Sequence, residues 1–404
     1  MRDTNLLQLA LGLTPPWIVT KADFDAAARR LDIHIDFPAG ARFACPSCGA
    51  ANCPVHDTSA KTWRHLDFFQ HQAFLNARVP RIRCDRCGVK QTPVPWARPD
   101  SGFTLLFEAL IMALVSAMPV AAVARLIGEH DTRLWRVMHH YVEQARARLD
   151  MAGVSRVAID ETAARRGHAY VTLFVDIDEA RVLHVTEGKD AATVAAFVED
   201  LAAHGGDPGA VREVCIDMSP AFISGTAESL PGASVTFDKF HAVKLINEAV
   251  DKVRRAEQRG QAILKGTRYL WLRNPENLSD RQHAMLDALP KHHLKTARAW
   301  RMKLAFQELY DQPTPARAAG WLKRWLSWAA HSRLMPMIDV AATIRRHRDG
   351  ILRWFDSRIA NGLIEGINSL VQAAKAKARG YRSVRNLETM IYLIAGKLDF
   401  RLPA

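Results

Sequence analysis

The stretch Val214-Cys215-Ile216-Asp217-Met218-Ser219 decides the fold, because an apolar strand pattern ends here on a carboxylate. An Asp at the junction of a strand and a loop is held rigidly at the edge of a sheet, which is a common place for a cleft. Such an Asp can bind a metal ion, and it can equally cap a loop or pair with an arginine. The role of Asp217 therefore depends on which other acidic residues reach the same edge.

Two further carboxylates have the setting of partners for Asp217. Asp160 ends the apolar run 157–159, and Glu365 lies in the stretch 362–366, GLIEG. Hard divalent cations take oxygen ligands, and a few carboxylates plus a substrate phosphate form their usual site. Carboxylates held close together repel one another unless cations are present. The pattern therefore predicts a site for Mg²⁺ or Mn²⁺, at which two ions about 3.5–4 Å apart support in-line displacement at a phosphate.

Other acidic residues compete for these roles. Glu161 is an alternative to Asp160, although strand alternation places it on the opposite face. Asp238 ends another predicted strand, and His241 follows it by three residues. We interpret Asp238 and His241 as residues that support the metal ligands from behind, with plain packing as the alternative. Asp176 and Asp178 are further acidic candidates at a strand end.

The segment around these residues alternates strands with helices. The pattern predicts strands at 157–160, 170–177 and 182–185, a helix at 191–203, and strands at 211–217 and 234–238. The run 171–177 is nearly all apolar, as a central strand covered on both faces should be. Three strands, a helix and further strands make an α/β arrangement, which is also the element order of the ribonuclease H-like fold.

Upstream, two similar knuckles predict a metal site of another kind. Cys45-Pro46-Ser47-Cys48-Gly49 and Cys84-Asp85-Arg86-Cys87-Gly88 each place a pair of cysteines in a tight turn, followed by a Gly that tolerates positive φ. Four thiolates, from Cys45, Cys48, Cys84 and Cys87, make a closed tetrahedral Zn²⁺ site with a structural role. Cys53 and His56 form a third pair that competes as ligands, and we interpret them as loop residues.

Basic and aromatic residues are interleaved between the knuckles. Arg64, Arg81 and Arg83 stand among Trp63, Phe68 and Phe69, with Lys61 and Arg78 nearby. This mixture suits a nucleic-acid surface, and a solvated basic face is the alternative. The preceding residues 1–37 show a helical pattern from Phe24 to Leu31, then strand alternation at 33–37.

Residues 96–150 predict three helices after a boundary at 93–96. The first spans 103–118, the second begins at Pro119 and runs to Ile127, and Asp131 caps the third after a turn at 128–130. A core stripe of the third helix is formed by Leu134, Met138, Tyr141 and Ala145. Arg133, Arg136 and His140 lie on another face, as expected for a helix-turn-helix whose last helix enters the major groove. A packing helix with a solvated face is the alternative.

Downstream, residues 241–345 are predicted to be helical and basic. From residue 251 to 304 there are 13 Lys/Arg against 5 Asp/Glu, so this segment carries most of the chain's net charge of +13. Trp321, Trp325 and Trp328 recur at helical spacing and predict a core stripe.

The helix around Glu365 is amphipathic. Its expected buried stripe is Leu363, Ile367, Leu370, Val371 and Ala374. Glu365 falls roughly 160–200° from that stripe, so it should face a cleft or solvent, with Asn368 and Gln372 on its side. Lys375, Arg379 and other basic residues follow, which suits DNA phosphates or an ordinary solvated helix face.

The length, charge and composition of the chain agree with a folded DNA-binding protein of several domains. The chain has 404 residues, a pI near 9.7 and 49% hydrophobic residues. Its length exceeds one ordinary core, and its charge favours a polyanionic partner. No apolar run approaches the roughly 20 residues of a membrane span, and no signal peptide is recognisable. We expect a protein of the bacterial cytoplasm, with no membrane contact.

A set of motifs stands in order along nearly the whole chain. Besides the two knuckles it comprises Trp63-Arg64-His65-Leu66-Asp67, Arg81-Ile82-Arg83-Cys84, Pro95-Trp96-Ala97, Ile159-Asp160-Glu161, Asp217-Met218-Ser219, Phe237-Asp238-Lys239-Phe240-His241 and Gly362-Leu363-Ile364-Glu365-Gly366. Together these motifs resemble the bacterial insertion-sequence transposases of the ISL3 family.

The resemblance implies a DDE transposase, with Asp160 and Asp217 as the first two acidic ligands and Glu365 as the third. It implies a multidomain α/β protein: a zinc ribbon, a helix-turn-helix, and a ribonuclease H-like catalytic core with a helical insertion. The expected ranges are an N-terminal segment 1–37, a zinc finger 38–95, a helix-turn-helix 96–150, the first catalytic part 151–249, the insertion 250–345 and the second catalytic part 346–404.

The implied activity is cleavage at the ends of the element by metal-activated water, followed by attack of the exposed 3′-hydroxyl on target DNA. The zinc finger and helix-turn-helix would bind the terminal inverted repeats, and the insertion would clamp flanking or target DNA. The expected partners are double-stranded DNA and a second copy of the chain in a homodimer. The alternatives are a metal-dependent nuclease or resolvase without strand transfer, and a DNA-binding regulator that uses only residues 38–150.

Overall fold

The computed structural model describes residues 3–165, 169–359 and 362–403, and it divides the chain into two compact units. The first comprises residues 1–145 with 399–404, and the second comprises residues 146–398. Each unit is described by itself below. None of the helices in the described ranges is both long enough and apolar enough to span a membrane.

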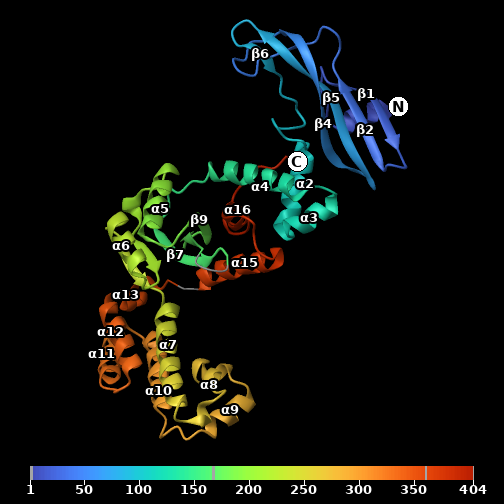
Figure 1. The fold of residues 1–404 in the computed structure, drawn as a ribbon. Coiled ribbons are helices and arrows are strands. Elements are labelled where there is room, and N and C mark those ends of the chain that lie inside the picture. Colours follow the sequence, from blue (N-terminus) through green and yellow to red (C-terminus); the bar gives the residue numbers. More distant parts are fainter. Residues whose placement is uncertain (1–2, 166–168, 360–361, 404) are drawn as a thin grey trace. The chain divides into compact units, whose positions relative to one another are not determined.

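The first unit contains a six-stranded sheet. After the short helix α1 (Asp3–Ala10), its strands are β1 (Ile18–Asp25), β2 (Arg30–Asp36), β3 (Arg42–Phe43), β4 (Cys53–Phe68), β5 (His71–Cys84) and β6 (Gly88–Gln91). They are ordered β1-β2-β5-β4-β3, and β6 pairs with β5 (Figure 1). The long hairpin β4–β5 forms the centre of this sheet. Its buried side carries Trp63 and Leu75, which pack with Trp17 and Trp96.

The helix predicted from Phe24 to Leu31 is wrong. These residues form a hairpin, in which Phe24 of β1 pairs with Leu31 of β2. The Ala-rich segment between them is a turn, closed by a hydrogen bond from Ala28 N to Asp25 Oδ1 (2.8 Å). Arg29 takes positive φ there, which ends the turn and starts β2. Alanines favour a helix locally, but pairing with β5 on the other side of β2 stabilises the strand instead.

Three helices complete the first unit: α2 (Leu105–Ala117), α3 (Val120–Ile127) and α4 (Asp131–Arg146). Thr104 caps α2, and Gly128 ends α3 with a left-handed backbone (φ 69°). Leu134, Met138, Tyr141 and Ala145 of α4 are all buried, as predicted. The helix, turn and helix arrangement expected for residues 96–150 is therefore present.

The second unit is built on a five-stranded sheet. Its strands are β7 (Arg156–Ala163), β8 (Tyr170–Asp176), β9 (Arg181–Glu187), β10 (Glu213–Ile216) and β11 (Ser234–Phe237). The order is β11-β10-β7-β8-β9. β7, β8 and β9 pair antiparallel, whereas β10 runs parallel to both β7 and β11. Strand order and direction place the ends of β7, β10 and β11 at one edge of the sheet.

Helices cover both faces of this sheet (Figure 1). On one face α5 (Ala191–Ala203) and α6 (Pro220–Ser229) bury Val157, Ile159, Val214 and Ile216 in the core. On the other face lie α15 (Gly362–Ala378) and α16 (Val384–Ala395). The hydroxyl of Tyr392 on α16 accepts a hydrogen bond from Val185 N of β9 (2.9 Å). Since Asp160 alternates with Ile159, its side chain lies on the α15 face.

A helical segment lies between β11 and α15, as predicted. Its α-helices are α7 (Lys239–Gln258), α8 (Arg268–Leu272), α9 (Asp280–Asp287), α10 (Lys295–Gln307), α11 (Pro315–Ala330), α12 (Met335–Arg346), α13 (Arg348–Leu352) and α14 (Trp354–Ser357). The segment also contains the 3₁₀ turns η2 (Ala262–Leu264), η3 (Pro275–Asn277) and η4 (Glu308–Asp311). Another 3₁₀ turn, η1 (Pro208–Ala210), precedes β10. Its core is continuous with that of the sheet through α7.

Two predicted helical stripes need correction. Trp325 is buried and Trp321 is partly buried, but Trp328 is 43% exposed, so the tryptophan stripe does not extend that far. In α15 the buried residues are Ile364, Ile367 and Val371, and Leu370 is 52% exposed. Apolar residues occur on more than one side of α15, and the side that faces the sheet is set by the polar contacts described next.

Candidate functional site

Asp160 and Asp217 lie at the same edge of the second sheet. β10 and β7 pair in parallel, with Cys215 opposite Ala158. Asp217 lies two residues after Cys215, and Asp160 lies two residues after Ala158. Neighbouring residues of parallel strands point to the same face, so the register carries both acidic residues to one edge. Their predicted juxtaposition thus follows from the observed pairing.

Asp160 is held from two sides. Its Oδ1 accepts a hydrogen bond from Glu161 N (2.8 Å), and its Oδ2 accepts one from the side-chain amide of Asn368 on α15. Burial raises the pKa of Asp160 to about 6, while the imidazole of His241 acts in the opposite direction. A buried carboxylate with a raised pKa gains most from a cation, because the cation offsets the cost of its charge.

Asp217 lies where β10 passes into α6. Its Oδ1 accepts a hydrogen bond from Ser219 N (2.8 Å), which fixes the turn before Pro220 begins the helix. The second oxygen takes no part in this turn. The capping role considered for Asp217 is therefore real, and it leaves one carboxylate oxygen for a ligand.

Asp238 and His241 form a pair at the neighbouring strand end. Asp238 Oδ1 accepts from Phe240 N (2.7 Å) and caps α7, while Oδ2 accepts from Nδ1 of His241 (2.9 Å). The hydrogen bond to Asp238 raises the pKa of His241 against the effect of burial, and the charges of Asp160 and Asp217 add to the rise. The pair therefore lies within electrostatic reach of Asp160 and Asp217, and its supporting role stays a prediction.

Glu161, the alternative to Asp160, also lies within electrostatic reach of Asp217. Strand alternation does place it on the face opposite Asp160, yet burial and then the charge of Asp217 raise the pKa of Glu161. Its Oε2 is buried and has no hydrogen-bond partner among the described residues. The sheet edge can therefore offer a cation oxygen atoms from both faces of β7, which suits a hard ion.

Glu365 lies on the first turn of α15 and is exposed, as predicted. It lines an open hollow of about 1000 Å³ together with Lys239 and Phe240 of α7. Within residues 3–165, 169–359 and 362–403, the carboxylates of Asp160, Asp217 and Glu365 do not form a group with all ligand atoms within 4.8 Å of one another. The structure thus brings Asp160 and Asp217 to one edge and places Glu365 on the helix that contacts Asp160.

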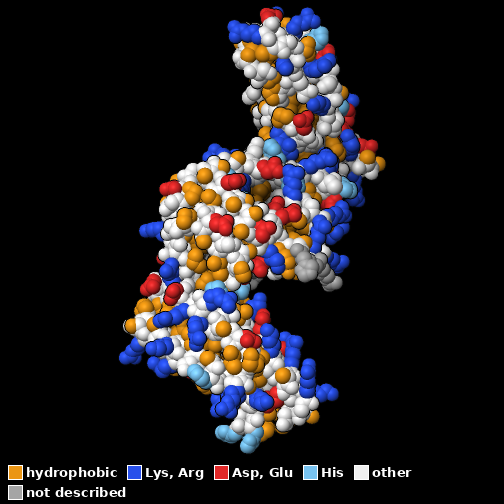
Figure 2. All heavy atoms as spheres, turned by 60° about the vertical axis from the view of Figure 1, so that its left-hand side comes forward, with side chains coloured by type: hydrophobic (Ala, Val, Ile, Leu, Met, Phe, Trp, Pro, Cys, Tyr) orange, Lys and Arg blue, Asp and Glu red, His pale blue; other side chains and the backbone are white. Residues whose placement is uncertain are grey.

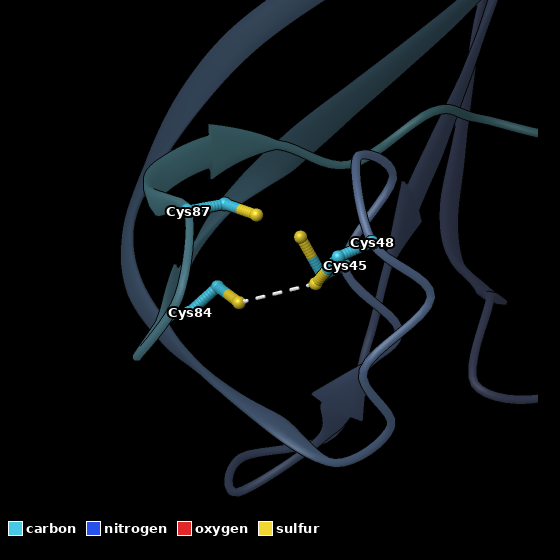
Figure 3. Close-up of side chains that lie close together, drawn as sticks. All are labelled: Cys45, Cys48, Cys84 and Cys87. Carbon is cyan, nitrogen blue, oxygen red and sulfur yellow. Dashed lines mark hydrogen bonds between the residues drawn. The ribbon is translucent and has the colours of Figure 1, made fainter.

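The four cysteines do form such a group. The Sγ atoms of Cys45, Cys48, Cys84 and Cys87 all lie within 4.8 Å of one another, with Cys48 and Cys84 3.6 Å apart (Figure 3). Gly49 and Gly88 take positive φ of 72° and 70°, as their knuckles require. Backbone N–H groups of Arg86 and Cys87 lower the pKa of Cys84 to about 6, which favours the thiolate that zinc binds. These thiols fit a structural Zn²⁺.

Cys53 and His56 are strand residues of β4, so their placement in a loop was wrong. Cys53 is buried close to the cluster, and its thiol donates to Ala50 O (3.4 Å). His56 contacts Arg83 through Nδ1 (3.3 Å). Neither belongs to the four-residue group among the described residues.

The structure contradicts a DNA-binding role for Arg64. Its side chain is buried (2% exposed) and donates to Ala73 O (3.2 Å), His65 O and Asp67. Arg81 is exposed but paired through two hydrogen bonds with Asp57, and Arg83 is exposed beside His56. Arg64 thus stabilises the β4–β5 hairpin, and Arg81 carries little net charge to a partner.

The predicted DNA-contacting residues of α4 differ in exposure. Arg133 is bound to Glu129 (2.5 Å) and Gly102 O (3.2 Å), and it lies 4.0 Å from the ring of Phe103. His140 is half-buried, and burial lowers its pKa. Arg136 is exposed. Arg136 is therefore the member of the set that is best placed to reach DNA.

The C-terminal end of α15 lines a second hollow, of about 1020 Å³, which we call the Arg379 hollow. Among the described residues its charged lining comprises Arg165, Lys375, Arg379 and Arg382 and includes no carboxylate. Lys375 also donates to Ala163 O of β7, and Gln372 to Thr162 Oγ1 (2.6 Å). Arg165 was not anticipated, because its nearness to α15 depends on the fold. Figure 2 shows further Lys and Arg side chains on the part formed by α7–α12.

Comparison with known proteins agrees with this arrangement. Residues 157–391 match a family model described as a transposase of the DDE type, residues 92–142 match the helix-turn-helix domain of transposase family ISL3, and residues 41–87 match the zinc finger of the transposases of IS204, IS1001, IS1096 and IS1165. The matched models cover the zinc ribbon, the helix-turn-helix and the sheet of the second unit, so the chain is a transposase, a class of enzymes that cut and transfer DNA. The chain belongs to the ISL3 family of insertion-sequence transposases.

Relatives that match most of this chain are also described as transposases of insertion sequences. The transposase for insertion sequence element IS1557 of Mycobacterium tuberculosis is 28% identical over 433 aligned positions, which cover 97% of this chain and 96% of the relative. The transposase for IS1001 of Bordetella parapertussis is 29% identical, over 88% of this chain and 89% of the relative. The recognition made from the ordered motifs is confirmed.

Proposed function

We propose that this transposase binds the terminal inverted repeats of its element, cleaves at the ends, and joins the 3′ ends to target DNA. Asp160, Asp217 and Glu365 are the proposed ligands of Mg²⁺ or Mn²⁺, in a ribonuclease H-like core. The observation that carries this proposal is the parallel pairing of β7 with β10, which aligns Asp160 with Asp217. The strand order β9-β8-β7-β10-β11 also supports it, because the second acidic strand lies directly beside the first.

The chain's own residues have distinct tasks at this site. Asp160 and Asp217 present oxygen atoms from adjacent strands, and Asn368 orients Asp160. Asp238 orients His241 toward the same edge. Bound divalent cations would supply positive charge at the scissile phosphate and make water or a 3′-hydroxyl a better nucleophile. Each reaction exchanges one P–O bond for another, so no further reactant is needed.

The remaining parts are proposed to hold DNA. The zinc finger and the helix-turn-helix bind the terminal repeats, with Arg136 of α4 as the leading contact and Arg83 on the zinc-finger sheet. Lys375 and Arg379 bind phosphates in the Arg379 hollow, whose charged lining residues, as far as the structure describes them, are all basic. The basic helical segment contacts flanking or target DNA, and two copies of the chain act together on the two ends.

A strand-transfer assay separates this function from that of a nuclease or resolvase. A duplex that carries one end of the element, labelled on its 3′ strand, is incubated with the protein, Mg²⁺ and a supercoiled plasmid. A transposase transfers the label to the plasmid, in covalent linkage that survives denaturation. Cleaved duplex without labelled plasmid would identify a nuclease and overturn the proposed joining step.

A further inference from the structure

The hollow that contains Glu365 differs in charge from the Arg379 hollow at the other end of α15. We call it the Glu365 hollow. Its lining has the carboxylates of Glu276, Glu308, Asp311 and Glu365 against the two cations Lys239 and Arg273. Carboxylates repel a phosphate backbone, so this lining selects against the part of DNA that the Arg379 hollow attracts. The part of the DNA that enters this hollow beyond Glu365 is therefore a neutral group rather than a phosphate.

The inner wall of the Glu365 hollow carries amide and hydroxyl groups. Asn247 Oδ1 and the Tyr310 hydroxyl are buried and have no hydrogen-bond partner among the described residues. Gln307 Nε2 donates to Asn274 Oδ1 (2.8 Å) on the same lining. Buried polar atoms are nearly always paired, and unpaired ones signal an absent partner. Such atoms match a ligand with several donors and acceptors on one edge.

An exposed aromatic ring lies on the same lining. Phe240 is 54% exposed, although large apolar side chains are usually covered. It directly follows Lys239, and its backbone N–H is held by Asp238 at the acidic edge. This bond places the backbone of Phe240 near the acidic edge, where the scissile phosphate is proposed to bind. An exposed ring at such a position can stack on a planar group.

We propose that the Glu365 hollow receives one nucleobase of the DNA end, unstacked from the duplex next to the cleavage site. The inference rests on the proposed function, since it places DNA at Asp160 and Asp217. A nucleobase is neutral and planar, and its edge carries the donors and acceptors that Asn247, Tyr310 and the carboxylates can pair. The hollow of about 1000 Å³ has room for a nucleoside. Enzymes that act on a base of duplex DNA extrude its nucleotide into a protein pocket in this way.

The binding of a base is tested with 2-aminopurine, whose fluorescence rises when it leaves the base stack. Duplexes that carry the element's end, with 2-aminopurine at single positions around the cleavage site, are titrated with the full-length protein and Ca²⁺. We expect one position to brighten with the wild-type protein and not with Phe240→Ala. No brightening at any position, in complexes shown by gel shift to form, would overturn the proposal.

Cleavage rates give a second readout. Phe240→Ala is expected to slow cleavage of the normal end by about 5- to 100-fold, the loss of one base–aromatic stack. An abasic nucleotide at the brightening position should restore much of that rate, because no base then has to be unstacked. Asn247→Leu tests the inner wall by the same two readouts. Phe24→Ala removes another exposed aromatic, on β1 outside the hollow, and should change neither.

The outcomes also separate this inference from the proposed function. If Phe240→Ala cleaves like Phe24→Ala and the abasic end shows no rescue, the base site is wrong and the transposase activity stands. If the wild-type protein binds ends without any cleavage, the proposed function fails first. Urea midpoints equal to the wild type show that the variants are folded.

Discussion

The side-chain amide of Asn368 on α15 donates a hydrogen bond to Asp160 on β7, across 208 positions of sequence. The next contacts along the helix are made by Gln372 with Thr162 and by Lys375 with Ala163. Residues 368, 372 and 375 thus contact positions 160, 162 and 163 of one strand in order. This contact series holds the helix that carries Glu365 beside the strand that carries Asp160.

We expect Asn368→Ala to slow end cleavage by about 10- to 100-fold, with DNA-end affinity unchanged. A hydrogen bond to a charged group contributes about 1.5–3 kcal/mol, and here it positions a proposed metal ligand. Single-turnover cleavage and gel-shift titration measure the two quantities. Ser369→Ala, at an exposed neighbouring position of α15, is the matched control. Equal rates for both variants would show that Asn368 has no positioning role.

Zinc content should depend on four cysteines and not on their neighbours. Cys84→Ser or treatment with a strong chelator should release the ion and weaken DNA-end binding, because the knuckles lose the bond that holds them together. Cys53→Ser and His56→Ala should each retain one Zn²⁺ per chain in metal analysis of the purified protein. Loss of zinc from either control would make that residue a ligand and overturn the four-cysteine assignment.

The two arginines of α4 should behave differently. Arg136→Ala is expected to weaken end binding. If Arg136 contacts a phosphate, the slope of log K against log salt concentration should become less steep by about 1. Arg133→Ala should mainly lower thermal stability, since Arg133 binds Glu129 and Gly102 within the domain. Fluorescence anisotropy at several salt concentrations and thermal melts check both. The reverse result would place Arg133 on the DNA.

The buried Lys303 should make the free energy of unfolding depend on pH. It is fully buried, and its Nζ donates to the carbonyls of Leu272 (2.7 Å) and Arg273 (3.0 Å) at the end of α8. Burial lowers the pKa of Lys303 from 10.5 to about 8, so between these pH values the unfolded chain binds more protons than the folded one. The free energy of unfolding should therefore rise with pH over this window, by up to about 3 kcal/mol, and be flat below it.

Urea unfolding followed by tryptophan fluorescence measures this rise. Lys303→Met should abolish it, whereas Lys295→Met, at an exposed position of the same helix, should keep it. A rise of the same size in both variants would assign the effect to other groups.

Sequence patterns predicted the sheet of the second unit because its strands are apolar and bounded by carboxylates. Helix α5 begins and ends where its pattern placed it, at Ala191 and Ala203. The knuckle cysteines were equally legible, since spacing alone constrains four thiolates. In these places local pattern and tertiary structure agree.

The failures have a common physical origin in contacts between distant residues. Phe24–Leu31 is a hairpin because β5 pairs with β2, and Arg64 is buried because β5 supplies Ala73 O. Residues of the Glu365 hollow, such as Asn247 and Tyr310, come from separate helices. Short-range sequence patterns cannot predict contacts between distant residues, so these contacts had to be read from the three-dimensional structure.

The central claim is that Asp160, Asp217 and Glu365 act together in DNA cleavage. The most direct measurement compares Asp217→Asn with the wild type in end binding and in Mg²⁺-dependent cleavage of the same labelled duplex. We expect unchanged binding and a loss of cleavage of roughly 1,000-fold or more, shared by Asp160→Asn and Glu365→Gln, because residues that act as a unit fail together. Cleavage by Asp217→Asn at the wild-type rate would contradict the account.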